Sequence, residues 1–92
     1  MPVSPMYKVK ETIEFEKPDK KRGGTKTAYL DLIKYGRNWY SVLRNGKTLY
    51  GYLDRQGSDE LFAAEVFEMK RKGWVVESES NDPTVDVPDF RG

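Results

Sequence analysis

Apolar and polar residues alternate along the first part of the chain. From Tyr7 to Glu16 the large apolar side chains fall on every second position, with Glu11 as the one interruption, and this period is typical of a strand with one buried face. The segment 27–35 is rich in aromatic and β-branched residues and predicts a second strand. Residues 17–26 hold a proline, two glycines and five cations but no large apolar side chain, which indicates a loop.

The dipeptide Asn45-Gly46 predicts a tight hairpin between two further strands, residues 39–44 and 47–54. Both residues tolerate the positive φ angles of a two-residue type I′ loop, so the loop sets the register and places Trp39 opposite Tyr52. Cross-strand partners share a face, which divides the hairpin into two rows. One row holds Tyr40, Val42, Leu49 and Leu53, and the other holds Trp39, Leu43, Tyr50 and Tyr52 with Ser41 and Thr48.

An amphipathic helix is expected after the hairpin, beginning at Ser58 or Asp59 and ending near Lys72. Gly73 follows as the left-handed residue at which helices commonly stop. At 100° per residue the apolar side chains gather on one face. That face comprises Phe62, Ala63, Val66, Phe67 and Met69. We expect it to cover the aliphatic row of the hairpin. The aromatic row is then either exposed or covered by the N-terminal strand, by Trp74-Val75 or by a second copy of the chain.

The expected order is therefore four strands and a helix, with residues 74–76 as a short closing strand or a packed extension. Short connections favour an antiparallel meander of four to five strands with one amphipathic helix packed on one face, an α+β fold. We expect residues 1–79 to form this single domain, because 92 residues leave no room for a second core. Residues 80–92 are acidic and rich in Asp and Pro, which predicts a flexible tail.

The chain contains no cysteine and no histidine. A disulfide framework, a thiolate nucleophile and the usual zinc sites are excluded, and the commonest general base is missing. Gly23-Gly24 lacks the spacing of a nucleotide-binding motif. We therefore expect a binding module rather than an enzyme, with no metal and no small-molecule cofactor. No apolar run has signal-peptide or membrane-spanning length, so the expected location is the cytoplasm, with no membrane partner.

Charge is distributed unevenly along the chain. Residues 1–76 hold fifteen basic and ten acidic side chains, whereas residues 77–92 hold one basic and five acidic ones. Such asymmetry points to nucleic acid or to an acidic interaction tail. The first hypothesis is a module for single-stranded DNA or RNA, in which bases stack on aromatic rings and phosphates meet cations. The rings would be those of Trp39, Tyr50 and Tyr52, and the cations Lys20, Lys21, Arg22, Arg37 and Arg55.

The same aromatic row supports a second hypothesis, a protein-interaction module that acts as an accessory subunit or a small inhibitor of a larger complex. Trp, Tyr and Arg dominate binding hot spots, and the partner would be another protein or a second copy of the chain. Two plainer interpretations compete with both hypotheses. Half-exposed aromatic ladders stabilise sheets by themselves, and a basic loop is often only a solvated turn.

At the level of topology, a four-stranded sheet followed by a helix resembles the PUR repeats and the Whirly proteins, and this resemblance implies single-strand binding. The acidic C-terminal segment is loosely similar to the tails of bacterial single-stranded-DNA-binding proteins, which end in Pro-Phe. Here Asp89 separates Pro88 from Phe90, and two further residues follow. Two roles stay open for the tail: it folds back on a basic surface, or Val87 and Phe90 dock in a groove of a partner.

Overall fold

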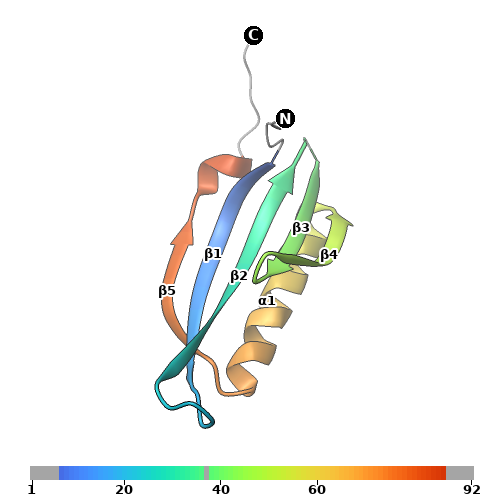
Figure 1. Cartoon of the computed structure of the whole chain (residues 1–92). Helices are drawn as coiled ribbons and strands as arrows, with labels where there is room; N and C mark the ends of the chain where they lie inside the picture. The colour runs from blue at the N-terminus through green and yellow to red at the C-terminus, as the bar shows by residue number, and fades with distance from the viewer. Residues whose placement is uncertain (1–6, 37, 87–92) are drawn as a thin grey trace, which may run out of the picture.

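The computed structural model describes residues 7–36 and 38–86. Four strands come first along the chain, followed by a helix, a fifth strand and one turn of 3₁₀ helix (Figure 1). In chain order these elements are β1 (Tyr7–Pro18), β2 (Thr25–Tyr35), β3 (Trp39–Arg44), β4 (Lys47–Leu53), α1 (Arg55–Arg71), β5 (Val75–Asn81) and η1 (Pro83–Asp86).

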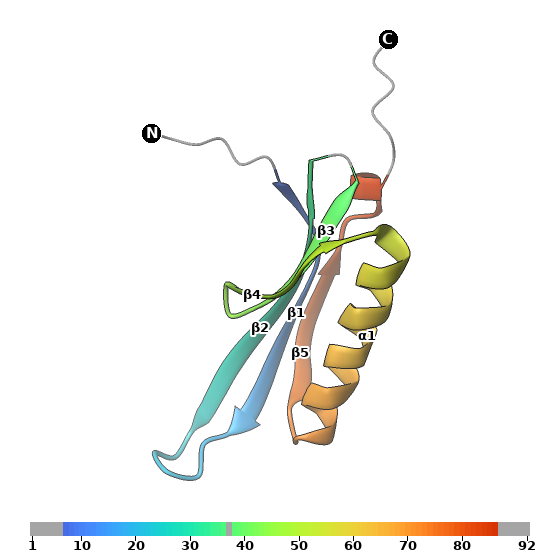
Figure 2. The same cartoon turned by 90° about the vertical axis from the view of Figure 1, so that its right-hand side faces the viewer.

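All five strands belong to one antiparallel sheet, in the order β4-β3-β2-β1-β5. The strands β1 to β4 form a meander, and α1 then carries the chain back across the sheet so that β5 pairs with β1 at the opposite edge. Helix α1 lies on one side of the sheet, and no other described element covers the opposite side (Figure 2). The predicted α+β fold is therefore confirmed.

The core lies between α1 and the side of the sheet that faces it. Strand β2 supplies its centre, because every second residue from Ala28 to Leu32 points toward the helix and is buried. The row of the hairpin that contains Tyr40 and Val42 is the one that α1 covers, as predicted. The buried cluster comprises Ile13, Phe15, Ala28, Leu30, Leu32, Tyr40, Val42, Phe62 and Met69.

Helix α1 begins one turn earlier than predicted. Asp54, rather than Ser58 or Asp59, is the N-cap, and its carboxylate accepts a hydrogen bond from the Gly57 N–H at 2.7 Å. Ser58 lies inside the first turn, fully buried, and its hydroxyl donates to a backbone carbonyl one turn back. The predicted end is confirmed, since Gly73 follows the helix with φ +101°.

The helix buries a narrower stripe than predicted. Phe62 and Met69 are buried and Val66 is half-buried, but Ala63 and Phe67 are exposed, and Phe67 keeps 68% of its surface in solvent. The reason is the position of α1, which packs mainly on β3 with smaller contacts to β2, β4 and β5. Ala63 and Phe67, one turn apart, fall outside the stripe that meets the sheet, so their predicted burial is wrong.

A bulge at Lys10 turns the two halves of β1 to opposite sides of the sheet. Lys10 is the extra residue between the pairs that Val9 and Glu11 make with β2. Tyr7 and Val9 consequently face away from α1, whereas the buried Phe15 faces toward it. The prediction of one apolar row along the whole strand is wrong, and Glu11, which interrupts that row, marks the place where the faces change.

The β3–β4 hairpin keeps its predicted register only for the two residue pairs nearest the turn. Beyond them Val42 pairs with Tyr50 instead of Leu49, and a second irregularity follows in β4. Tyr52 adopts φ +54° in this stretch. The predicted register is wrong from Leu49 onward because extra residues in β4 shift the pairing, and Tyr50 joins the helix-facing row beside Val42 at the edge of the sheet.

The chain continues in defined structure beyond residue 79. Strand β5 runs to Asn81, and η1 places Val85 in a buried position against β1. The Asp82 N–H donates to the Lys10 carbonyl at 2.8 Å, and Lys34 Nζ donates to the Val85 carbonyl at 3.2 Å. Residues 80–86 of the expected tail thus pack on the domain. The two tail residues expected to contact a partner, Val87 and Phe90, lie outside the described residues.

Candidate interaction surface

Four aromatic side chains form a row across the uncovered side of the sheet. Tyr7 on β1 pairs with Tyr35 on β2, and Tyr35 pairs with Trp39 on β3. The Trp39 ring meets the Tyr52 ring of β4 edge to face, with ring centroids 6.1 Å apart. Cross-strand partners share a face, so the four side chains occupy neighbouring positions on one face of the sheet. We call Tyr7, Tyr35, Trp39 and Tyr52 the aromatic row.

The aromatic row faces away from α1, because Trp39 alternates along β3 with Tyr40, which is buried beneath the helix. The exposed fraction of its members ranges from 39% for Tyr35 to 77% for Tyr52. With roughly 200 Å² for each ring and about half of each exposed, the row offers on the order of 400 Å² of aromatic surface. That area is comparable to the largest apolar patches of typical monomers, about 300–600 Å².

The backbone of Tyr52 is strained. Its φ of +54° lies in the left-handed region, which costs a bulky residue roughly 1–2 kcal/mol. The irregular pairing of β4 places this residue next to Trp39 with its ring turned outward. Such strain persists only where the surrounding structure enforces it, and it is commonest at binding sites. Tyr52 is therefore a functional candidate on grounds independent of its exposure.

A second row extends the apolar surface toward the middle of the sheet. Val9 on β1 pairs with Ile33 on β2, which pairs with Ser41 on β3. Val9 is exposed, whereas Ile33 and Ser41 are covered by their neighbours. Gly51 of β4 lies over Ser41, since a Cβ there would be 3.7 Å from Ser41 Oγ. The aromatic row is thus bordered, along the strands, by a second row whose inner members are tightly packed.

Farther along the sheet the uncovered side becomes acidic. Glu14 pairs with Tyr29, and Thr12 pairs with Asp31, on the same face as the aromatic row. Asp31 lies on the central strand β2 and accepts a hydrogen bond from the Thr12 hydroxyl at 2.7 Å. Among the described residues that face this side on β1, β2 and β3, none is a cation.

The basic loop predicted to bind phosphate lies at the other end of the molecule (Figure 1). Lys20, Lys21 and Arg22 follow the end of β1, whereas Tyr7 stands at its beginning. At roughly 3.3 Å per residue, β1 separates the loop from the aromatic row by about 35 Å. The Asp19 carboxylate holds the turn by accepting hydrogen bonds from the N–H groups of Lys21 and Arg22, and the three cationic side chains are exposed.

The other predicted binding residues are also dispersed. Arg55 lies in the first turn of α1, on the opposite side of the sheet, where its guanidinium is 3.9 Å from the Asp86 carboxylate. Tyr50 stands at the sheet edge in the helix-facing row, and Arg37 lies outside the described residues. The structure therefore brings together only Trp39 and Tyr52 of the aromatic residues, and it keeps the basic loop apart from both.

A polar cluster that the sequence did not reveal lies on the helix side of the sheet. Lys10 Nζ is 2.8 Å from the Asp86 carboxylate and 3.0 Å from that of Asp59, and the Tyr40 hydroxyl donates to Asp86 at 2.6 Å. The bulge in β1 is what turns Lys10 toward these partners, and the polar Glu11 in an apolar row was its only sign in the sequence. Through these ion pairs and this hydrogen bond, the cluster connects η1 and the first turns of α1 to β1 and β3 of the sheet.

The pKa values of this cluster follow from burial and pairing. Burial opposes the charge of Asp86, but hydrogen bonds from Lys10 and Tyr40 outweigh it and lower the pKa of Asp86. Burial alone would lower the pKa of Lys10. The bonds of Lys10 to Asp86 and Asp59 together outweigh this effect, so the pKa of Lys10 is raised. Burial and the bond to Asp86 raise the pKa of Tyr40. At neutral pH the cluster therefore holds a charged lysine and carboxylate beside a neutral phenol.

Within the described ranges, no three Asp, Glu, His or Cys side chains gather in a way that would hold a metal ion. In the same ranges, no helix has both the length and the apolar character needed to cross a membrane. Comparison with protein-family models, with curated proteins and with solved structures finds no match for this chain.

Proposed function

We propose that this chain is a non-enzymatic protein-interaction module that binds through the aromatic row, and that the surface it fits best is the aromatic row of a second copy. The observation that carries the proposal is the presence of four exposed aromatic side chains at neighbouring positions across β1, β2, β3 and β4. Rigid aromatic side chains give large contact areas at low entropic cost and are enriched at binding hot spots.

A second copy is favoured because an uncharged aromatic surface is complementary to itself. A two-fold interface brings the same patch from both subunits, and each aromatic pair adds about 0.5–1.5 kcal/mol beyond area burial. Sheets pack face to face at about 10 Å. Glu14 and Asp31 lie roughly 15–25 Å along the strands from the aromatic row, so two copies that cross at the row keep these acids apart.

The size of the surface predicts a weak and reversible contact. About 400 Å² of exposed rings on each copy, with a rim around them, gives an interface near the low end of specific complexes, roughly 1,000–1,200 Å² in total. Interfaces of this size without buried charge pairs correspond to dissociation constants in about the micromolar range. We therefore expect self-association that depends on concentration and responds weakly to salt.

Single-stranded nucleic acid is the second candidate, and the exposed rings of Trp39 and Tyr52 favour it as well. Bases would stack on these rings, but three of the described cations expected to meet the phosphates, Lys20, Lys21 and Arg22, lie about 35 Å away, and Arg55 lies on the opposite side of the sheet. The face between the two regions carries Glu14 and Asp31, which repel a phosphate backbone. These positions favour a protein partner over nucleic acid.

The test is sedimentation equilibrium over a concentration range from about 5 to 500 µM, which brackets a micromolar dissociation constant. The wild-type chain should form a dimer as its concentration rises. Trp39→Ala should weaken the dimer at least tenfold. Tyr52→Gly removes a ring while fitting the positive φ, and should weaken it about threefold or more. Phe67→Ala, which removes an exposed ring on α1, is the matched control and should change nothing.

A wild-type chain that stays monomeric throughout this range overturns the proposal. The proposal is also overturned if Phe67→Ala weakens the dimer as much as Trp39→Ala does. A titration with a single-stranded oligonucleotide accompanies the sedimentation experiment. It is done in a Trp74→Phe background, so that Trp39 is the one source of tryptophan fluorescence. Quenching that falls steeply as salt rises, in a chain that does not dimerise, selects the nucleic-acid candidate instead.

A further inference from the structure

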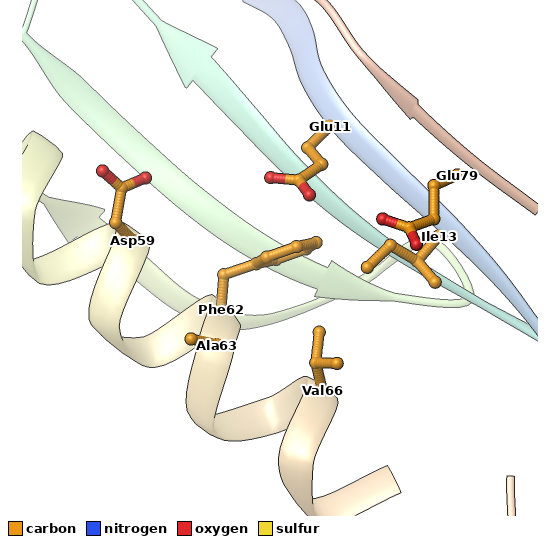
Figure 3. A pocket seen from close by; sticks show the side chains of 7 residues that line it. All are labelled: Glu11, Ile13, Asp59, Phe62, Ala63, Val66 and Glu79. Atoms are coloured by element: carbon orange, nitrogen blue, oxygen red, sulfur yellow. The ribbon is translucent and has the colours of Figure 1, made fainter. Parts of the chain in front are cut away.

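An open groove of about 410 Å³ lies on the helix side of the sheet, between α1 and the half of the sheet formed by β1 and β5 (Figure 3). One stripe of α1 forms its first wall, because the four lining residues of the helix recur at i, i+3, i+4 and i+7. The lining residues are Asp59, Phe62, Ala63 and Val66 on α1, Glu11 and Ile13 on β1, and Glu79 on β5.

The groove exists because one helix is too narrow to cover five strands. With neighbouring strands about 4.8 Å apart the sheet is roughly 19 Å wide, whereas a helix with its side chains measures about 10–12 Å across. Helix α1 packs mainly on β3 and lies on the β2–β4 side of the sheet in Figure 1. The remaining width, over β1 and β5, is roughly 7–9 Å, slightly less than the diameter of one further helix, and β5 is an edge strand.

The floor of the groove is apolar. Ile13 and Phe62 belong to the hydrophobic core, and the outer edges of their side chains line the groove. Val66 is half-buried and lines it as well. Ala63 contributes only a methyl group to the wall, which leaves room above the floor. Phe67, one turn after Ala63 on α1, is exposed and lengthens this apolar strip beyond the groove itself. Such a strip on an otherwise polar helix is typical of a binding groove rather than of a solvated face.

The rim of the groove is acidic. The carboxylates of Glu11 and Glu79 lean over the floor from the sheet, and Asp59 stands on the helix opposite (Figure 3). Asp59 is paired with Lys10, but neither Glu11 nor Glu79 is in an ion pair with a described cation. Burial and the repulsion from Glu79 raise the pKa of Glu11. A cation placed between the two glutamates would relieve this repulsion.

We propose that this groove docks one amphipathic helix of a partner protein, with an apolar stripe on the floor and Lys or Arg residues against Glu11 and Glu79. A helix laid over β1 and the edge strand β5 can extend slightly past the sheet, the apolar floor matches its apolar stripe, and the acidic rim matches its basic flanks. The α1 helix of a second copy does not fit, because it would bring Glu60 and Glu65 against an acidic rim. The docking surface lies on the face opposite the aromatic row.

The test uses a synthetic peptide of about 18 residues with Leu at i, i+3, i+4 and i+7 and Lys at most other positions, labelled for fluorescence anisotropy. Ala63→Arg places bulk and positive charge in the groove and should weaken peptide binding at least tenfold. Its matched control is Ala64→Arg, the neighbouring exposed position of α1 outside the groove, which should leave binding unchanged.

The rim is tested separately. Glu79→Gln should weaken binding about threefold and reduce its salt dependence. Glu77→Gln, on the same strand but not in the groove lining, should have no effect. A second peptide with Glu in place of Lys keeps the apolar stripe and should bind at least tenfold more weakly than the Lys peptide.

Three results would each overturn the proposal: no saturable binding of the Lys peptide up to about 1 mM, equal losses from Ala63→Arg and Ala64→Arg, or equal affinity for the Lys and Glu peptides. This inference stands apart from self-association through the aromatic row. Trp39→Ala and Tyr52→Gly, which should disrupt the dimer, should leave peptide affinity unchanged. A monomeric chain that still binds the Lys peptide therefore separates the two proposals.

Discussion

At the scale of single residues, Asp86 holds the last described turn of the chain on the domain. Its carboxylate accepts hydrogen bonds from Tyr40 and Lys10 on two different strands. Because the folded pKa of Asp86 lies below its usual value, this carboxylate contributes stability that is present above the unfolded pKa of about 3.9. That contribution is lost as the pH falls through the folded pKa.

Asp86→Asn should therefore lower the free energy of unfolding by about 1–2 kcal/mol at pH 7, since it removes one charged acceptor from a half-exposed cluster. The difference between variant and wild type should shrink as the pH falls below about 4, because Asp86 of the unfolded chain is then protonated, and it should disappear once the pH falls through the lower folded pKa. Urea unfolding at several pH values measures both effects, with the exposed Glu77→Gln as control. A difference that stays constant down to pH 2 would contradict this assignment.

At the scale of elements, the start of α1 depends on Asp54. Asp54→Ala should lower the free energy of unfolding by about 1 kcal/mol, because the Gly57 N–H loses its acceptor in the first turn. Asp54→Asn keeps a capping oxygen and should retain most of that stability. Urea unfolding of the two variants compares them directly. Equal losses from Ala and Asn would indicate that the charge of Asp54, rather than the cap, stabilises the helix.

The existence of the elements could be predicted from local signals, but the faces of the strands could not. Alternation, Asn45-Gly46 and Gly73 correctly located strands, turn and helix end, because each depends on neighbouring residues alone. One extra residue in a strand turns every following side chain to the other face of the sheet. The bulge at Lys10 has this effect in β1, and the irregularities in β4 have it in the β3–β4 hairpin. Only tertiary pairing determines where such a residue is tolerated.

The candidate site shows the same division between local and tertiary information. The meeting of Trp39 and Tyr52 was predicted from an ideal hairpin, whereas the structure reaches it through irregular pairing and a positive φ at Tyr52. Tyr7 was assigned to the covered face because the bulge was not foreseen, so the aromatic row was expected to be shorter. The exposure of Phe67 was missed because the lateral position of α1 depends on packing, not on periodicity.

At the scale of the whole molecule, the sheet presents two different surfaces. One side carries the aromatic row, which is uncharged and which we propose binds a second copy. The other side carries an apolar groove with an acidic rim beside α1, which fits a basic helix. Because the sheet separates the two surfaces, both can be occupied at once. A dimer formed through the aromatic row would then display two grooves on its outer faces.

The central claim, that the aromatic row of one copy contacts that of another, is tested most directly by isotope-filtered NMR. In an equal mixture of labelled and unlabelled chains at a concentration where dimers form, NOEs should connect the Trp39 indole of one copy to tyrosine rings of the aromatic row in the other. Trp74, which packs against the core, should show none. Intermolecular NOEs confined to other surfaces, or none from Trp39, would contradict the claim.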